Sequence, residues 1–220
     1  MGVFSLNTTA KEPHSSVLAL CDFNGTIVDA DMIKALAAGA GAAASPFEPG
    51  TREDIEHYAR QLSFDRSEAE NHIEAAVNFD SSFVPFERAC FAAGVLLIVI
   101  TSGVRELVER YLQRRNVSVP VFSNDADISR DGWRMRFRDD SPAGIDKAAF
   151  ALAALRDGRK VAVIGDDRSD FEAALAASIV FAKRSSPLDH FLHDRRRKVR
   201  TFSTFTEILK RWPPSTRHSI

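Results

Sequence analysis

The chain of 220 residues has few cysteines, no excess of either charge and no long apolar run. Cys21 and Cys90 lie beside expected core segments, so a reduced chain is a simpler interpretation than a disulfide scaffold, although two thiols can pair. The longest apolar run, Gly94 to Ile100, is far below the roughly 20 residues that span a bilayer, so we expect no membrane segment. With 29 basic and 30 acidic residues, the chain does not have the charge of a general polyanion binder, and we expect no nucleic-acid partner.

The one strongly basic run, "HDRRRKVR" at residues 193–200, is expected to be a solvated face, because no aromatic residues alternate with its charges. The first residues lack the apolar core of a signal peptide, and Leu6 stands where a myristoylation motif needs Ser or Thr. We therefore expect a cytoplasmic protein, either a monomer or a homodimer, with tails at residues 1–14 and 213–220.

Four apolar runs flanked by turn residues predict buried strands. They are Val17 to Cys21, Leu96 to Ile100, Val119 to Phe122 and Val161 to Ile164. Segments with helical periodicity lie between or after them: Phe86 to Ala93, Arg105 to Arg115, Lys147 to Leu155 and Asp170 to Ala177. Strands that alternate with helices predict an α/β fold with a doubly wound, mostly parallel sheet. A hairpin is expected from Ile128 to Phe137, with its turn at Asp131 and Gly132.

The interval from Ala30 to Ser82 has little strand signal and is rich in Ala, Glu, His and Arg. Within it, Ile55, Ala59 and Leu62 recur at helical spacing. We therefore expect a helical cap subdomain at residues 31–82, inserted into an α/β core formed by residues 15–30 and 83–212.

The first candidate site follows the first strand directly, in the sequence DFNGT, which contains Asp22, Asn24, Gly25 and Thr26. Ligands of open α/β sheets bind beyond the carboxyl ends of strands. Gly25 lets the backbone turn sharply and leaves its amide unobstructed. An ordinary Asx-type turn accounts for the same residues.

The second candidate site follows the strand that begins at Leu96 and contains Thr101, Ser102 and Gly103. A hydroxyl at a strand end, followed by glycine and a helix, can bind an oxyanion with help from the helix N-terminus. The alternative is that Thr101 or Ser102 is only the N-cap of the next helix.

Two further candidates carry charge. Lys147 lies near the start of a helix, the wrong end for a cation, which indicates an anionic partner unless the lysine is merely solvated.

Asp166, Asp167 and Asp170 crowd together after another strand. Such carboxylates repel one another unless a cation or hydrogen-bond donors offset their charge, and their oxygens suit Mg²⁺. The alternative is a polar loop in which Ser169 or Asp170 caps the next helix.

The order of these motifs, strand-Asp-x-x-Gly-Thr, strand-Thr-Ser-Gly, helix-Lys and strand-Gly-Asp-Asp-x-x-Asp, resembles the haloacid dehalogenase superfamily of phosphohydrolases over essentially the whole ordered chain. The helical insertion resembles the small cap of phosphoserine phosphatases. "FDSSFVPFERAC", "VPVFSND", "GWRMRF" and "SIVFAKRSSPLDHFL" are similar to the enol-phosphate phosphatases of methionine salvage.

The resemblance implies that Asp22 is a nucleophile that forms an aspartyl-phosphate on a small phosphorylated metabolite. It implies phosphate binding by Thr101 and Lys147, with the neighbouring residues Gly25, Thr26, Ser102 and Gly103. It also implies that Mg²⁺ is bound by Asp22, the backbone carbonyl of Asn24 and Asp166, with support from Asp167 and Asp170. The cap residues Arg52, His57, Arg60 and Arg66 are candidates for reading the rest of the substrate, or are simply surface charges.

Asn24 departs from the family pattern, in which this position is an aspartate that acts as general acid and base. An amide has no useful pKa for that task, so we expect slow hydrolysis with metal and phosphate binding retained. Three explanations stay open: an engineered variant, a natural slow phosphatase or phosphotransferase, and a binding or regulatory protein without turnover. Carbon-halogen hydrolysis is disfavoured, because it has no use for the acidic cluster.

Overall fold

The computed structural model describes residues 16–212, and its sheet has the order β4-β3-β2-β1-β5-β6-β7. The strands are β1 (Val17–Cys21), β2 (Leu96–Val104), β3 (Val121–Asp127), β4 (Arg134–Arg136), β5 (Lys160–Gly165), β6 (Ile179–Lys183) and β7 (Arg200–Phe202). All neighbouring strands pair in parallel except β3 and β4, which are antiparallel. The predicted doubly wound, mostly parallel α/β fold is confirmed. The expected tails, residues 1–14 and 213–220, lie outside the described residues.

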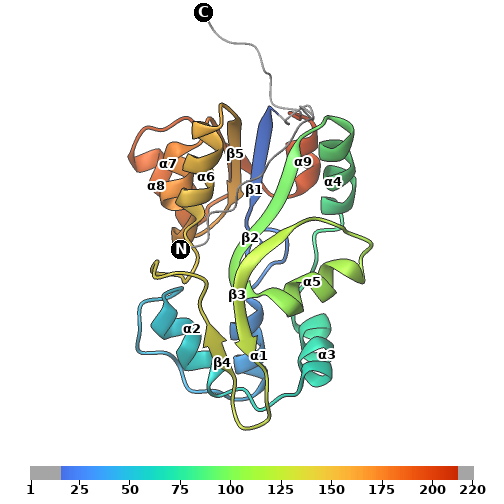
Figure 1. Cartoon of the computed structure of the whole chain (residues 1–220), viewed down its shortest axis with the longest axis vertical. Coiled ribbons are helices and arrows are strands. Elements are labelled where there is room, and N and C mark those ends of the chain that lie inside the picture. Colours follow the sequence, from blue (N-terminus) through green and yellow to red (C-terminus); the bar gives the residue numbers. More distant parts are fainter. Residues whose placement is uncertain (1–15, 213–220) are drawn as a thin grey trace, which may run out of the picture.

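Helices cover both faces of the sheet (Figure 1). They are α1 (Met32–Gly39), α2 (Arg52–Ala59), α3 (Arg66–Ala76), α4 (Phe83–Ala92), α5 (Arg105–Gln113), α6 (Lys147–Arg156), the 3₁₀ helix η1 (Arg168–Asp170), α7 (Phe171–Ala176), α8 (Pro187–Asp194) and α9 (Phe205–Leu209). Successive residues of a strand point to opposite faces. In β1, Val17, Ala19 and Cys21 therefore join one buried cluster, while Leu18 and Leu20 join the other.

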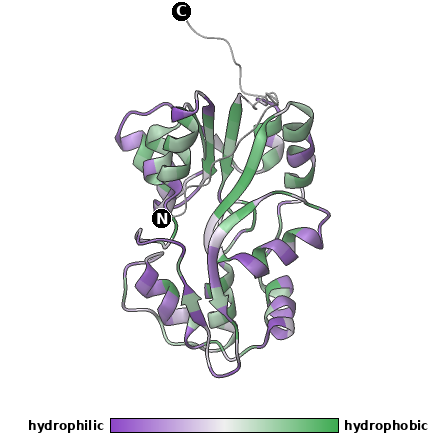
Figure 2. Cartoon of the chain, viewed as in Figure 1, coloured by the Kyte–Doolittle hydropathy of each residue, from purple (hydrophilic) through white to green (hydrophobic). Residues whose placement is uncertain are grey.

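The lower half of the molecule is a helical lobe formed by α1, α2 and α3, which lies beyond the carboxyl ends of the sheet strands (Figure 1). Its helices present polar outer faces and pack their apolar faces inward (Figure 2). Ile55, Ala59 and Leu62 are buried there, as the helical spacing predicts. The β3–β4 hairpin extends into the same lobe, where Trp133 is fully buried and its Nε1 donates to the carbonyl of Phe64 at 2.9 Å.

Some predicted boundaries are wrong. β2 continues beyond Ile100 to Val104, β3 begins two residues later than the predicted strand at Val119 and runs to Asp127, and β6 and β7 were not predicted. The predicted hairpin forms, but its pairing joins residues 125–127 to residues 134–136, so it extends to the N-terminal side of Ile128. Both cysteines are buried and free. Among residues 16–212, no helix has the length and apolarity needed to cross a membrane.

Candidate active site

Asp22 stands at the carboxyl end of β1, in the centre of the sheet, between β2 and β5. Its backbone N–H donates to the carbonyl of Ile164 at 2.8 Å, which continues the β1–β5 pairing one residue further. Its carboxylate is buried, and Oδ1 lies 2.6 Å from Nζ of Lys147. Lys147 begins α6 and also donates to Asp170 Oδ1 at 2.8 Å. The structure thus brings together side chains from three segments that are distant in the sequence.

The charges of this buried cluster are tightly coupled. Burial raises the pKa of both Asp22 and Asp170, and the charge of Lys147 only partly opposes this shift. Burial lowers the pKa of Lys147, but the carboxylates of Asp170 and Asp22 more than compensate, so that pKa lies above its usual value. Lys147 is therefore a buried ammonium held by two carboxylates, and its interpretation as a solvated lysine is wrong.

Asp166 faces the same cluster from the end of β5. Its Oδ1 accepts a hydrogen bond of 2.9 Å from the hydroxyl of Thr26. Burial, followed by the charges of Asp170 and Asp167, raises the pKa of Asp166 to about 7. Gly25 has a φ of +80°, and a Cβ atom there would lie 2.2 Å from Asp166 Oδ2. The turn after β1 and the acidic loop after β5 are therefore close enough that only glycine fits between them.

The donor set of this cluster fits a hard divalent cation. Oxygens of Asp22, Asp166 and Asp170 lie within 4.8 Å of one another. Oδ2 of Asp22 is buried and has no hydrogen-bond partner among the described residues. Carboxylate oxygens are the ligands that Mg²⁺ prefers, and a cation would satisfy this oxygen while offsetting the crowded negative charge.

Asp170 and Asp167 organise the acidic loop. Oδ2 of Asp170 accepts from the backbone N–H groups of Asp166 and Asp167 at 3.0 and 3.3 Å. Asp167 is the N-cap of η1, and its Oδ1 accepts from the N–H and the hydroxyl of Ser169. The predicted alternative of a helix cap is thus partly right, but the capping side chain is Asp167. The helix cap formed by Asp167 and the acidic cluster are therefore both present in this loop.

Thr101, Ser102 and Gly103 form an irregular stretch inside β2. The pairing of β2 with β3 passes from Ile100↔Phe122 directly to Val104↔Asn124, which leaves these residues as a bulge. Thr101 is fully buried, and its Oγ1 accepts from the Gly103 N–H at 3.3 Å. The N-cap of α5 is Val104, which makes no side-chain cap, so the N-cap interpretation of Thr101 or Ser102 is wrong.

Asn24 binds the start of the helical lobe through both ends of its amide. Nδ2 donates to Asp31 Oδ2 at 3.2 Å, and Oδ1 accepts from the Met32 N–H at 3.3 Å. Asp31 is the N-cap of α1 and also accepts from the Lys34 N–H at 2.9 Å. Burial raises the pKa of Asp31, and hydrogen bonds from the backbone oppose the shift. The amide at position 24 therefore joins the core turn to α1.

A cavity of about 340 Å³ opens in front of these groups, between the core and the helical lobe. Eight of its thirteen lining residues are polar or charged; the full set is Asn24, Gly25, Asp29, Ala30, Asp31, Lys34, Pro49, Gly50, Ser102, Asp166, Asp167, Arg168 and Pro187. Lys34, Asp31 and Arg168 were not predicted. Asp31 and Lys34 carry a detectable signal, since both lie within ten residues of Asn24 on a helix that follows the first motif directly.

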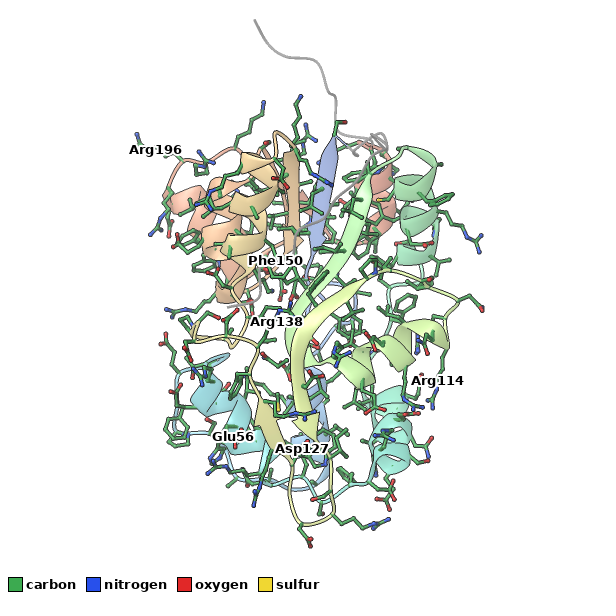
Figure 3. All side chains as sticks on the ribbon, in the orientation of Figure 1. Glu56, Arg114, Asp127, Arg138, Phe150 and Arg196 are labelled. Carbon is green, nitrogen blue, oxygen red and sulfur yellow. The ribbon has the colours of Figure 1, made fainter. Side chains whose placement is uncertain are left out.

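The four cap residues proposed to contact substrate do not line this cavity. Arg52 pairs with Asp140, Arg60 with Glu56 and Arg66 with Glu106, while His57 lies against the carbonyl of Ala43. Of the two interpretations that the sequence leaves open, these contacts favour the one in which the four residues are surface charges. The basic run also lies away from the cavity, and Arg196 projects from the outer edge of the core (Figure 3).

A central acidic cluster at the carboxyl ends of a parallel sheet, facing a lobe inserted after the first strand, is the arrangement of a hydrolase core with a cap. The family model for haloacid dehalogenase-like hydrolases matches residues 19–175. The chain belongs to this family, and the resemblance seen in its sequence motifs is confirmed.

Three curated proteins illustrate the relationship. Pdp3-interacting factor 1 of Schizosaccharomyces pombe is 31% identical over 159 residues, which cover 68% of this chain and 69% of that protein. Polyol phosphate phosphatase PYP1 of Saccharomyces cerevisiae is 27% identical over 62% of this chain and 64% of its own length. The 2-hydroxy-3-keto-5-methylthiopentenyl-1-phosphate phosphatase of Exiguobacterium sibiricum is 24% identical over 76% of this chain and 84% of its own length.

Solved structures share the fold. A substrate-bound phosphoserine phosphatase superimposes with a TM-score of 0.69 at 15% identity, covering 88% of this chain and 96% of that one. A phospho-aspartyl intermediate analogue of phosphoserine phosphatase gives a TM-score of 0.64 at 16% identity, covering 88% and 97% of the two chains.

Proposed function

We propose that the protein is a Mg²⁺-dependent phosphomonoesterase of small phosphorylated metabolites, which acts through an aspartyl-phosphate intermediate. The observation that supports it most is the convergence of Asp22 and Asp166, at the carboxyl ends of β1 and β5, with Lys147, at the start of α6, beside a cavity of metabolite size. The names of two relatives, a polyol phosphate phosphatase and a 2-hydroxy-3-keto-5-methylthiopentenyl-1-phosphate phosphatase, support the same substrate class.

In this proposal the Asp22 carboxylate attacks phosphorus, the P–O bond to the substrate breaks, and water later hydrolyses the acyl phosphate. Lys147, 2.6 Å from Asp22, orients the nucleophile and offsets charge on the phosphoryl oxygens. The Thr101 hydroxyl and the amides around Gly25 and Gly103 supply further donors. Their burial strengthens these interactions, because the surrounding water is excluded.

In this proposal Asp22, the backbone carbonyl of Asn24 and Asp166 would hold Mg²⁺, and Asp22 and Asp166 belong to the carboxylate cluster described above. When bound, the ion supplies positive charge that draws the phosphoryl group and the nucleophile together. Asp170 positions Asp166 through the Asp166 N–H, while it anchors Lys147 on its other oxygen.

Asn24 is expected to slow turnover. Its amide can neither protonate the leaving oxygen nor take a proton from water, and the loss of such a group lowers rates by roughly 10²- to 10⁴-fold. Acyl and enol phosphates have good leaving groups, so the first step suffers least with them. Hydrolysis of the aspartyl-phosphate stays slow, and the covalent intermediate is expected to accumulate.

The test is intact mass spectrometry after mixing the protein with Mg²⁺ and acetyl phosphate. A persistent adduct of about 80 Da that disappears in Asp22→Ala supports the proposal. Asp157→Ala is a suitable control, because Asp157 is the C-cap of α6, remote from the cavity lining.

A second candidate is a phosphate- or metabolite-binding protein without turnover. The engagement of Asn24 by Asp31 and Met32 favours it, because the amide is fixed away from any proton-transfer role. Measurable Mg²⁺ binding with neither adduct nor phosphate release would support this candidate and overturn the first.

A further inference from the structure

Asn124, on β3, is fully buried and uses its whole side-chain amide. Its Nδ2 donates to two carbonyl oxygens, that of Ser102 at 2.9 Å and that of Ala143 at 3.0 Å. Its Oδ1 accepts from the Arg138 N–H at 3.1 Å. One side chain therefore joins three backbone segments, two of which lead to groups of the candidate site.

The first of these bonds fixes the orientation of a peptide unit. In a planar trans peptide, the Ser102 carbonyl and the Gly103 N–H point in opposite directions. Because Asn124 holds the carbonyl, the Gly103 N–H is turned to the other side, where it meets Thr101 Oγ1 at 3.3 Å. Gly103 also lies beside Asn24, since a Cβ atom there would be 3.5 Å from Asn24 Nδ2. The bulge thus lies next to Asn24, and both Asn24 and Ser102 line the cavity.

The second bond holds the turn before Lys147. Ala143 precedes Gly144, which has a φ of +74° and whose carbonyl accepts from Arg138 and Asp139. A Cβ atom on Gly144 would lie 2.9 Å from Asn124 Oδ1 and 2.2 Å from Phe137. The backbone therefore approaches Asn124 as closely as glycine permits, three residues before the start of α6 and Lys147.

We propose that Asn124 is a positioning residue for phosphoryl binding. It orients the Ser102–Gly103 peptide so that its N–H faces the phosphoryl group, and it ties this peptide to the turn that carries Lys147. The proposal rests on the proposed function, because it concerns a phosphoryl group at Asp22. A purely structural role predicts loss of stability alone, whereas a positioning role predicts loss of phosphate affinity and rate as well.

The variant Asn124→Ala leaves two buried carbonyls without their donor, so its melting temperature is expected to fall. Trp133→Phe is the matched control, since it removes one buried donor, from the Phe64 carbonyl, in the helical lobe. Both changes are made in the parent chain with Asn24, for binding of inorganic phosphate with Mg²⁺, and in the Asn24→Asp background, for turnover of p-nitrophenyl phosphate. All measurements are made well below each melting temperature.

Loss of a preorganised donor lowers kcat by about 10²–10³-fold in other enzymes, and a donor that is only misoriented should cost less. We expect Asn124→Ala to weaken phosphate binding and to lower kcat, each by roughly 10- to 100-fold. Trp133→Phe should change both by no more than about twofold. If Asn124→Ala does not fold, Asn124→Ser, which retains one hydroxyl donor, is judged by the same criterion.

Asn124 variants that bind phosphate and turn over substrate as well as Trp133→Phe would overturn the positioning role. Failure of the parent and of Asn24→Asp to bind phosphate or to hydrolyse any ester is a different result. It would reject the proposed function itself, independently of Asn124.

Discussion

Asn24→Asp places a carboxylate where the structure has an amide donor. Nδ2 of Asn24 lies 3.2 Å from Asp31 Oδ2, so the new oxygen would stand at hydrogen-bond distance from another carboxylate. Two carboxylates this close cannot both ionise without strong repulsion, and the pair is expected to share a proton near neutral pH. The substitution therefore creates a protonated acid at the position where a leaving oxygen needs one.

The substitution should change both the rate of turnover and the stability of the fold. Turnover of a phosphate ester should rise by roughly 10²- to 10⁴-fold, the usual contribution of a general acid-base group. Stability should fall at alkaline pH, because a hydrogen bond to a charged group, worth about 1.5–3 kcal/mol, is replaced by repulsion. Since the pair has a raised pKa in the folded state, this loss is absent at low pH and develops as the pH rises through that pKa.

The assay is steady-state hydrolysis of p-nitrophenyl phosphate with Mg²⁺, together with melting temperatures from pH 5 to 9. The double variant Asn24→Asp with Asp31→Asn exchanges the two side chains and restores one donor opposite one carboxylate. It should regain the stability lost at high pH and carry an acid of lower pKa, so its optimum should move to lower pH. No gain of turnover in Asn24→Asp, with Mg²⁺ binding and fold intact, would refute the phosphatase assignment.

Three further outcomes are expected. Lys147→Met leaves the buried Asp22 and Asp170 unpaired, so it should destabilise the protein by about 3–5 kcal/mol at neutral pH, less at acid pH, and abolish the adduct in mass spectra. Gly25→Ala forces a Cβ into Asp166 at a φ of +80° and should weaken Mg²⁺ binding by roughly 10- to 100-fold in calorimetry; unchanged affinity would contradict the close packing. The pKa of Asp166 is about 7, above its ordinary value, so metal-free stability should fall as pH rises toward 7. Mg²⁺ affinity should rise over the same interval and then level off, and a flat profile in thermal shifts would exclude this carboxyl as a ligand.

The sequence predicts the centre of the fold well because the central strands are buried on both faces. Val17–Cys21 is apolar throughout, and β1 has the predicted limits. β7 is not predicted because it has only three residues, Arg-Thr-Phe. β6 is as long as β1, but its apolar run at residues 179–182 is followed by Lys183 and is not predicted as a strand. β2 was predicted too short, because Thr101 to Gly103 has the composition of a loop although the chain continues as a bulged strand.

The residues of the candidate site also differ in how well the sequence predicts them. Asp22, Lys147 and Asp166 are recognisable because each lies at a strand end or helix start, where parallel topology brings residues together. Asp31 and Lys34 carry only the signal of their closeness to the first motif, and Asn124 carries none, since the positions of all three depend on how α1 and the β3–β4 hairpin pack against the core. The cap arginines were chosen by charge alone, and charge on an amphipathic helix usually faces solvent.

Binding and turnover are separable in this site because they depend on different atoms of the first motif. The backbone turn through Asn24 and Gly25 sets the distance to Asp166, and that geometry does not require an acid at position 24. In the proposed mechanism, proton transfer depends on the side chain of residue 24, and here that side chain is hydrogen-bonded to Asp31 and Met32 instead. An amide at this position therefore removes one step of the proposed reaction and leaves Asp22, Lys147 and the acidic loop assembled. It follows that the geometry favours a trapped phosphoryl group over a protein that does not react with phosphate esters at all.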